Sequence, residues 1–148
     1  MNLPSLTQLI PILQLSVSPV ILISGVGLLL LTLTNRFGRM VDRARVLNRE
    51  LIQQSSEDAN IKAQIGILQR RAAILRLSIV LGVTTVLLAA VLILALFVSA
   101  LFKIEAGLLL IVIFCIGQLS LIGSMLAFIR DTNLSMVAIR LELGGRPD

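Results

Sequence analysis

Residues 77–102 read LSIVLGVTTVLLAAVLILALFVSALF and contain no charged side chain. A helix needs about 20 apolar residues to cross a bilayer, so this stretch predicts a membrane-spanning helix. Residues 1–35 and 106–129 are likewise free of charge and long enough to span. Over the whole chain of 148 residues, 57% of the side chains are hydrophobic and 14% are charged. Lipid must cover so much apolar surface, which excludes an ordinary soluble domain.

The basic residues are concentrated between the first two spans. Residues 36–76 carry nine of the thirteen: Arg36, Arg39, Arg43, Arg45, Arg49, Lys62, Arg70, Arg71 and Arg76. Short basic loops stay on the cytoplasmic side of a membrane. We therefore expect residues 36–76 and the tail 130–148 inside the cell, and the N-terminus and the turn at 103–105 outside. Three crossings agree with an outer N-terminus and an inner C-terminus.

The first charge-free stretch has two prolines, Pro4 and Pro11, near its beginning, and Ser18-Pro19 further on. Proline interrupts helices, but it is favoured at a first helical position behind a serine cap. The sequence predicts a segment at the outer membrane interface over residues 1–18 and a first span over residues 19–35. A longer first span that includes residues 1–14 stays open.

Residues 36–76 have the heptad spacing of two coiled-coil seams. The first seam is Met40, Ala44, Leu47 and Leu51, and the second is Ile61, Ile65, Leu68, Ala72 and Leu75. Antiparallel pairing places Met40 opposite Leu75, Ala44 opposite Ala72, Leu47 opposite Leu68, and Leu51 opposite Ile65. We expect a cytoplasmic helical hairpin with a polar turn at 53–58, where Ser55 and Asp58 form a capping box. The same seams could instead pair between subunits.

The spans 77–102 and 106–129 form a second hairpin, which turns at Lys103-Ile104-Glu105. A tail helix after residue 129 carries an apolar stripe at Leu134, Val137, Ala138 and Leu141, and Gly144-Gly145 ends it. The predicted fold class is an all-α membrane protein over residues 1–148, a single membrane domain. It has three transmembrane helices and a cytoplasmic antiparallel hairpin between the first two.

Small residues recur four positions apart in the second and third spans: Ser78/Gly82, Ala95/Ser99, Ser120/Ser124 and Gly123/Ala127. Such pairs let helices approach closely in lipid. We identify Gly82, Ser120, Gly123 and Ser124 as helix-packing residues. Packing within one subunit is the simpler interpretation, and a subunit interface is the alternative.

The first span is the most polar of the three. Ser24, Thr32 and Thr34 could line a pore formed by several subunits, with Arg36, Arg39 and Arg43 as basic rings at its inner mouth. The simpler interpretation is that these hydroxyls bond back to their own helix, while the arginines hold the topology or contact anionic lipid headgroups.

Catalysis and cofactor binding find no support in the sequence. It has no histidine, one cysteine and no nucleophile or acid–base constellation. The carboxylates Asp42 and Asp131 each follow or precede an arginine, as charge-balancing residues do. We expect no enzyme, no cofactor and no metal. Nucleic acid is not an expected partner, because acidic residues dilute the basic segment and aromatic side chains for base stacking are missing from it apart from Phe37.

Two segments, SVSPV at residues 16–20 and TNRFGRMVDRAR at residues 34–45, resemble a family of small bacterial inner-membrane proteins that has no assigned function. The resemblance implies a bacterial inner-membrane location and the three-span pattern, but no activity. The hypothesis with most support is a non-enzymatic membrane scaffold or interaction protein that self-associates or docks on a larger membrane complex. The alternative is a homo-oligomeric ion channel lined by the first span.

Overall fold

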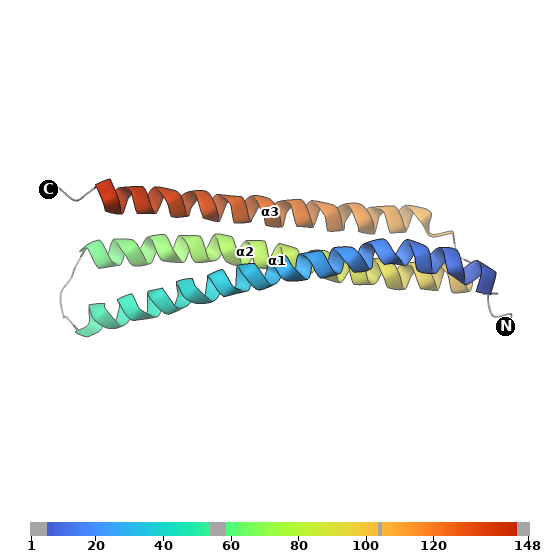
Figure 1. Ribbon diagram of the computed structural model, residues 1–148, viewed down its shortest axis with the longest axis horizontal. Coiled ribbons are helices and arrows are strands. Elements are labelled where there is room, and N and C mark those ends of the chain that lie inside the picture. Colours follow the sequence, from blue (N-terminus) through green and yellow to red (C-terminus); the bar gives the residue numbers. More distant parts are fainter. Residues whose placement is uncertain (1–5, 54–58, 104, 145–148) are drawn as a thin grey trace. The chain divides into compact units, whose positions relative to one another are not determined.

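Three long helices make up the described chain (Figure 1). The computed structural model describes residues 6–53, 59–103 and 105–144. Helix α1 is Leu6–Gln53, α2 is Ala59–Phe102 and α3 is Gly107–Gly144. Their 48, 44 and 38 residues correspond to about 72, 66 and 57 Å at 1.5 Å per residue. Each helix is thus much longer than the hydrocarbon layer, which is about 30 Å thick.

All three helices are long and apolar enough to cross a membrane, as the sequence predicts. The candidate spans are Leu13–Arg49, Gln64–Phe102 and Gly107–Leu134. Large apolar side chains such as Leu28, Leu108 and Leu119 are exposed along them, and the buried hydrophobic side chains of the described residues are Val26, Leu33, Leu75 and Ala89. A surface this apolar is suited to lipid and not to water, which indicates a multi-pass membrane protein.

The prediction that a helix begins at Pro19 is wrong, and the structure has the longer helix that the sequence leaves open as the alternative. Helix α1 already starts at Leu6 and continues through both Pro11 and Pro19. Proline is tolerated inside membrane helices because neighbouring groups and small local adjustments satisfy the carbonyl that it leaves without a donor. The capping residues Ser55 and Asp58 lie outside the described residues, and so do the side chains of Leu51, of Ile61 and of the tail stripe beyond Leu134.

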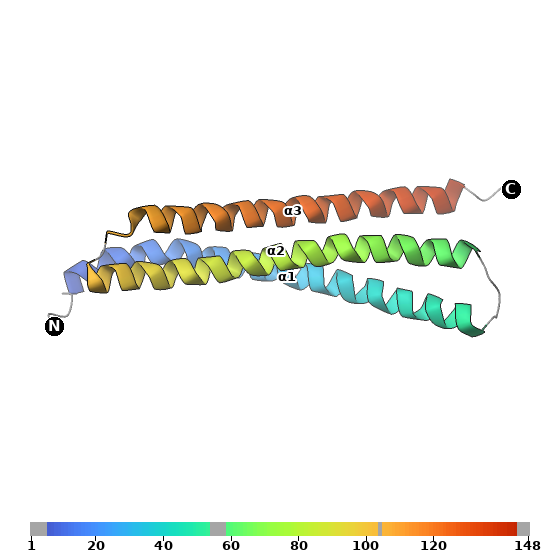
Figure 2. The same cartoon turned by 180° about the vertical axis from the view of Figure 1, so that it is seen from behind.

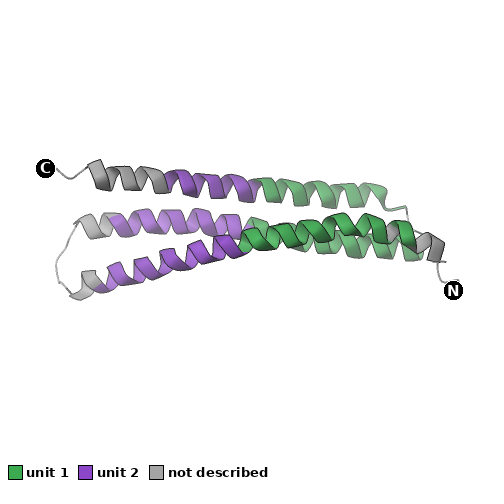
Figure 3. Cartoon of the chain, in the orientation of Figure 1, with its two compact units in different colours: residues 1–30, 81–122 green, residues 31–80, 123–148 purple. Residues whose placement is uncertain are grey.

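The chain divides into two compact units, each containing a segment of every helix (Figure 3). Unit 1 is Met1–Leu30 with Leu81–Ile122, and unit 2 is Leu31–Val80 with Gly123–Asp148. Within each unit the segment of α2 runs antiparallel to those of α1 and α3 (Figures 1 and 2). Unit 1 contains Lys103 and Glu105 as its charged residues, so unit 2 holds the other twelve basic and seven acidic side chains.

In unit 1, hydroxyl groups join α2 to α3. Ser120 Oγ donates to the carbonyl of Leu81 at 2.8 Å. The buried Thr85 hydroxyl lies 3.0 Å from that same carbonyl and 3.4 Å from the carbonyl of Gly117. Gly117 is itself buried beside Leu88. Small side chains thus bring the two helices close enough for a side chain of one to reach the backbone of the other.

The turn between α2 and α3 is short. Lys103 follows the last residue of α2 with a φ of 54°, the left-handed conformation that commonly ends a helix. The amide of Leu110 donates to the carbonyl of Ala106 at 3.1 Å, which begins α3. This turn keeps the two antiparallel segments of unit 1 adjacent.

Candidate functional site

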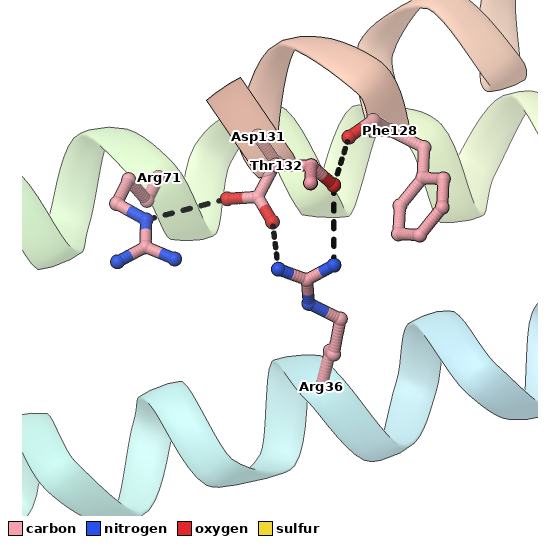
Figure 4. Close-up of polar contacts among 5 residues, drawn as sticks. All are labelled: Arg36, Arg71, Phe128, Asp131 and Thr132. Carbon is pink, nitrogen blue, oxygen red and sulfur yellow. Dashed lines mark hydrogen bonds and ion pairs between the residues drawn. The ribbon is translucent and has the colours of Figure 1, made fainter. Parts of the chain in front are cut away.

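A buried carboxylate on α3 links the three helix segments of unit 2 (Figure 4). The side chain of Asp131 has 0% exposure. Its Oδ1 lies 3.4 Å from Nε of Arg71 on α2, and its Oδ2 lies 3.5 Å from Nη2 of Arg36 on α1. Each of the two carboxylate oxygens therefore faces a guanidinium from a different helix. We call Arg36, Arg71 and Asp131 the ionic cluster.

Arg36 makes further contacts to α3 beyond the carboxylate. Its Nη1 donates to Oγ1 of Thr132 at 3.2 Å, and that hydroxyl donates to the carbonyl of Phe128 at 3.1 Å. The guanidinium carbon also lies 5.3 Å from the centre of the Phe128 ring, within the range of a cation–π interaction. A planar guanidinium can make all these contacts at once, which the point charge of a lysine cannot.

The ionic cluster is at the edge of the charge-free sequence. Arg36 is the first charged residue of the chain, and Asp131 follows the third charge-free stretch by two positions. Burying a carboxylate costs several kcal/mol, about what close guanidinium partners recover. With one carboxylate and two guanidinium groups, the cluster carries a net positive charge. Chemically it is a link between helices that has a fixed geometry, with no nucleophile in it.

Sequence reasoning assigned Asp131 to local charge balance and missed these distant partners. A signal was nevertheless present, because buried positions on α3 recur at heptad spacing: Gly117, Ser120, Ser124 and, seven residues later, Asp131. On α2 the same spacing runs through Leu75, Ser78, Gly82, Thr85 and Ala89, and Arg71 is four residues before Leu75. Extending both seams past the charge-free stretches leads to Arg71 and Asp131.

Two of the four predicted helix-packing residues, Ser120 and Ser124, make hydrogen bonds between α2 and α3. Ser78 and Ser124 are fully buried in unit 2 and bond reciprocally: each Oγ donates to the other residue's carbonyl at 2.7 Å, and the two Oγ atoms are 3.3 Å apart. In unit 1, Gly82 and Ser120 are buried. Gly123, in unit 2, is half-buried.

The residues proposed for a pore are not gathered into one site. Ser24, Thr32 and Thr34 are exposed on α1. Ser24 donates to the carbonyl of Val20 at 3.3 Å, and Thr34 to that of Leu31 at 3.0 Å, so both bond back to their own helix. Of the three arginines in the predicted basic rings, Arg36 belongs to the ionic cluster, and Arg39 and Arg43 are exposed.

The described part of the chain contains no group of three or more histidine, cysteine, aspartate or glutamate residues that could hold a metal ion. The residues of unit 2 that could attract an anion are the exposed arginines, among them Arg39, Arg43 and Arg76. The site therefore offers positive charge and helix–helix contacts as its chemistry.

Comparison with curated proteins and with solved structures finds no match to this chain. A family model does match the chain, over residues 16–141. This range includes both segments on which the resemblance rests and all of the ionic cluster. The matching family is described as a protein of unknown function. The chain thus belongs to the DUF2721 family of proteins of unknown function.

Proposed function

We propose that this protein is a non-enzymatic scaffold of the bacterial inner membrane, which self-associates or docks on a larger membrane complex. The observation that carries the proposal is that some arginines are paired inside unit 2 and others are exposed. Arg36 and Arg71 are held by Asp131 inside unit 2, whereas Arg39, Arg43, Arg45 and Arg49 are exposed along α1. Helix α1 continues for about 27 Å beyond residue 35, and Arg39 and Arg43, four residues apart, lie on one face of it, so their charge is available to a partner.

The orientation that fits this role places the N-terminus outside and residues 36–76 with the tail inside. The excess of arginine in 36–76 supports it through the positive-inside rule. Cysteines introduced at Asn48 and at Glu105, each in a background without Cys115, test it in intact cells. A membrane-impermeant thiol reagent should label position 105 and not position 48. The reverse labelling would overturn the orientation.

A cytoplasmic hairpin formed by residues 36–76 is part of the proposal. Met40 and Ala44 of α1 and Ile65, Leu68 and Ala72 of α2, all seam residues, line one groove between these helices, which supports the pairing. A Leu47/Leu68 double-cysteine variant should form a disulfide within one chain under mild oxidation. Crosslinks that join two chains would assign the seams to a subunit interface instead.

The channel alternative has less support from the geometry of α1. Thr32 and Thr34 are separated by about 200° around the helix, at 100° per residue, so both cannot face one narrow axis. Asp131 also compensates part of the charge that Arg36 would give to a basic ring. Purified protein in planar bilayers should therefore be silent. If the protein conducts ions and the Ser24→Leu substitution abolishes this conductance, the channel function would replace the scaffold proposal.

The scaffold itself is tested by mild detergent extraction and mass measurement of the native complex. We expect a mass well above the 16.0 kDa of one chain, from added copies or from a partner. A variant with Arg39, Arg43 and Arg49 changed to glutamine should lose that added mass, because it removes exposed positive charge from α1. Lys103→Gln, a neutralisation at the far end of the spans, is the matched control and should keep it.

A further inference from the structure

A groove of about 500 Å³ lies between α1 and α2 in unit 2. That volume is in the range of ligand sites, roughly 300–1,000 Å³. Phe37 is its lining residue on α1, and α2 supplies the rest: Gln69, Ala72, Ala73, Arg76, Leu77 and Val80. It adjoins the groove lined by the seam residues, with which it shares Gln69 and Ala72.

The lining of this groove changes from apolar to polar along α2. Arg76 is the last charged residue before the charge-free stretch 77–102, and Leu77 and Val80, both exposed, belong to that stretch. In the opposite direction, Gln69 is two helical turns from Arg76, about 10 Å along the same face. The groove therefore crosses the junction between the hydrocarbon-facing and the charged part of α2.

Arg76 differs from the two arginines of the ionic cluster. Arg36 and Arg71 are held by Asp131, whereas the side chain of Arg76 is exposed and has no ion pair or hydrogen bond to any residue that the structure describes. None of the residues that line the groove is acidic. The groove thus combines one available cation, one amide and an apolar wall.

We infer that this groove binds one anionic phospholipid. The phosphate lies at Arg76, a polar headgroup extends toward Gln69, and an acyl chain packs along Phe37, Leu77 and Val80. In an anionic phospholipid the charged phosphate lies between the apolar acyl chains and the polar headgroup. The lining residues of α2 follow the same order, from Val80 and Leu77 through Arg76 to Gln69. A second copy of this chain fits less well, because pairing two such grooves brings two Arg76 side chains together without an acidic partner. The inference rests on the proposed membrane setting but not on the scaffold role.

Lipid selectivity measures the site directly. The full-length protein is reconstituted in phosphatidylcholine vesicles that contain traces of spin-labelled phosphatidylglycerol or spin-labelled phosphatidylcholine. The preference for the anionic label should fall about fivefold in Arg76→Gln, from the contribution of one basic residue near a charged headgroup. Arg76→Lys should retain most of it. Ala73→Leu should also lower binding, because it fills the groove without a change of charge.

Arg70→Gln is the matched control, since Arg70 is exposed on the same helix but does not line the groove. It should leave the preference within about twofold of the original. Equal losses in the Arg70 and Arg76 variants would reduce the effect to general surface charge and overturn the site. Thermal unfolding of each variant separates loss of binding from loss of fold. Because vesicle binding needs no protein partner, its outcome is independent of the scaffold tests.

A photoreactive amino acid in place of Leu77, a lining residue that already has a large side chain, identifies the occupant. In reconstituted protein, a product heavier by one phospholipid supports the inference. A product with the mass of two chains would assign the groove to a second copy, and an adduct to another protein in native membranes would assign it to a partner helix. Either of these results overturns the lipid site.

Discussion

Unit 1 and unit 2 use segments of the same three helices but hold them together with different chemistry. In unit 1 the contacts between α2 and α3 are those of small and hydroxyl side chains, such as Ser120 with the carbonyl of Leu81. Unit 2 has the Ser78–Ser124 hydrogen bonds between α2 and α3, and in addition the ionic cluster, which also connects α1. The difference follows the charge: unit 1 has two charged residues, and unit 2 has the rest.

This difference shows what each environment allows. In hydrocarbon an ion is too costly, while close packing and hydroxyl bonds are available. Arg36 and Arg71 lie outside the charge-free stretches, and with 26% and 18% exposure part of each side chain remains outside the protein interior. The desolvation cost of a salt bridge can therefore be compensated in unit 2, where the salt bridge specifies which helix faces are in contact.

Removing the buried carboxylate should have the largest effect. Asp131→Asn keeps the shape but leaves two arginines without their counter-charge. We expect a loss of about 3 kcal/mol, the low end for a broken buried pair, since the arginines are partly exposed. Unfolding by denaturing detergent, followed by circular dichroism, measures it.

Two comparisons sharpen that result. Asp42→Asn removes an exposed carboxylate that is 3.8 Å from Arg45 on the same helix, and it should cost less than about 0.5 kcal/mol. Replacing the whole ionic cluster by Arg36→Met, Arg71→Met and Asp131→Leu should restore most of the stability, because no buried charge then lacks a partner. Equal stability of the Asp131 and Asp42 variants would show that unit 2 does not depend on the cluster.

Unit 1 should be destabilised by a larger side chain between α2 and α3. Ser120→Leu puts a large side chain where α2 and α3 meet, and we expect a loss of about 2 kcal/mol from overpacking. Ser24→Leu in the same unit is the control, because Ser24 is exposed on α1 and the added side chain would face lipid. Similar stability of the two variants would contradict close packing of α2 against α3 in unit 1.

Loss of single hydroxyl bonds should matter less, and to a similar extent in both units. Ser78→Ala in unit 2 and Ser120→Ala in unit 1 should each cost about 0.6 kcal/mol, the average for hydrogen bonds between membrane helices. The same detergent unfolding assay applies. A cost of several kcal/mol for Ser120→Ala would mean that polar bonding, and not close approach, holds unit 1 together.

The sequence predicted the spans because their signal is local, whereas the ionic cluster depends on partners far apart in the chain. Charge-free stretches reveal three membrane helices by length alone. Asp131 beside Arg130 looks locally balanced, and only alignment of the heptad positions on α2 and α3 brings Arg71 to it. The sequence leaves the start of α1 open between Pro19 and an earlier residue, because a serine before a proline is typical of a helix start in water, whereas a membrane helix can continue through a proline.

The smallest predicted effect is a gain of stability at the turn of unit 1. Lys103 has a φ of 54°, a conformation that glycine adopts without the steric cost of a Cβ atom. Lys103→Gly should therefore stabilise the protein by about 0.5 kcal/mol or slightly more, less than the full steric cost because glycine also gains freedom in the unfolded chain. Lys103→Ala removes the same charge but retains the Cβ atom, so it should give no such gain. If alanine and glycine stabilise the protein equally, the gain comes from removal of the lysine charge and not from the backbone conformation. The stability of unit 1 would then depend on charge at its turn as well.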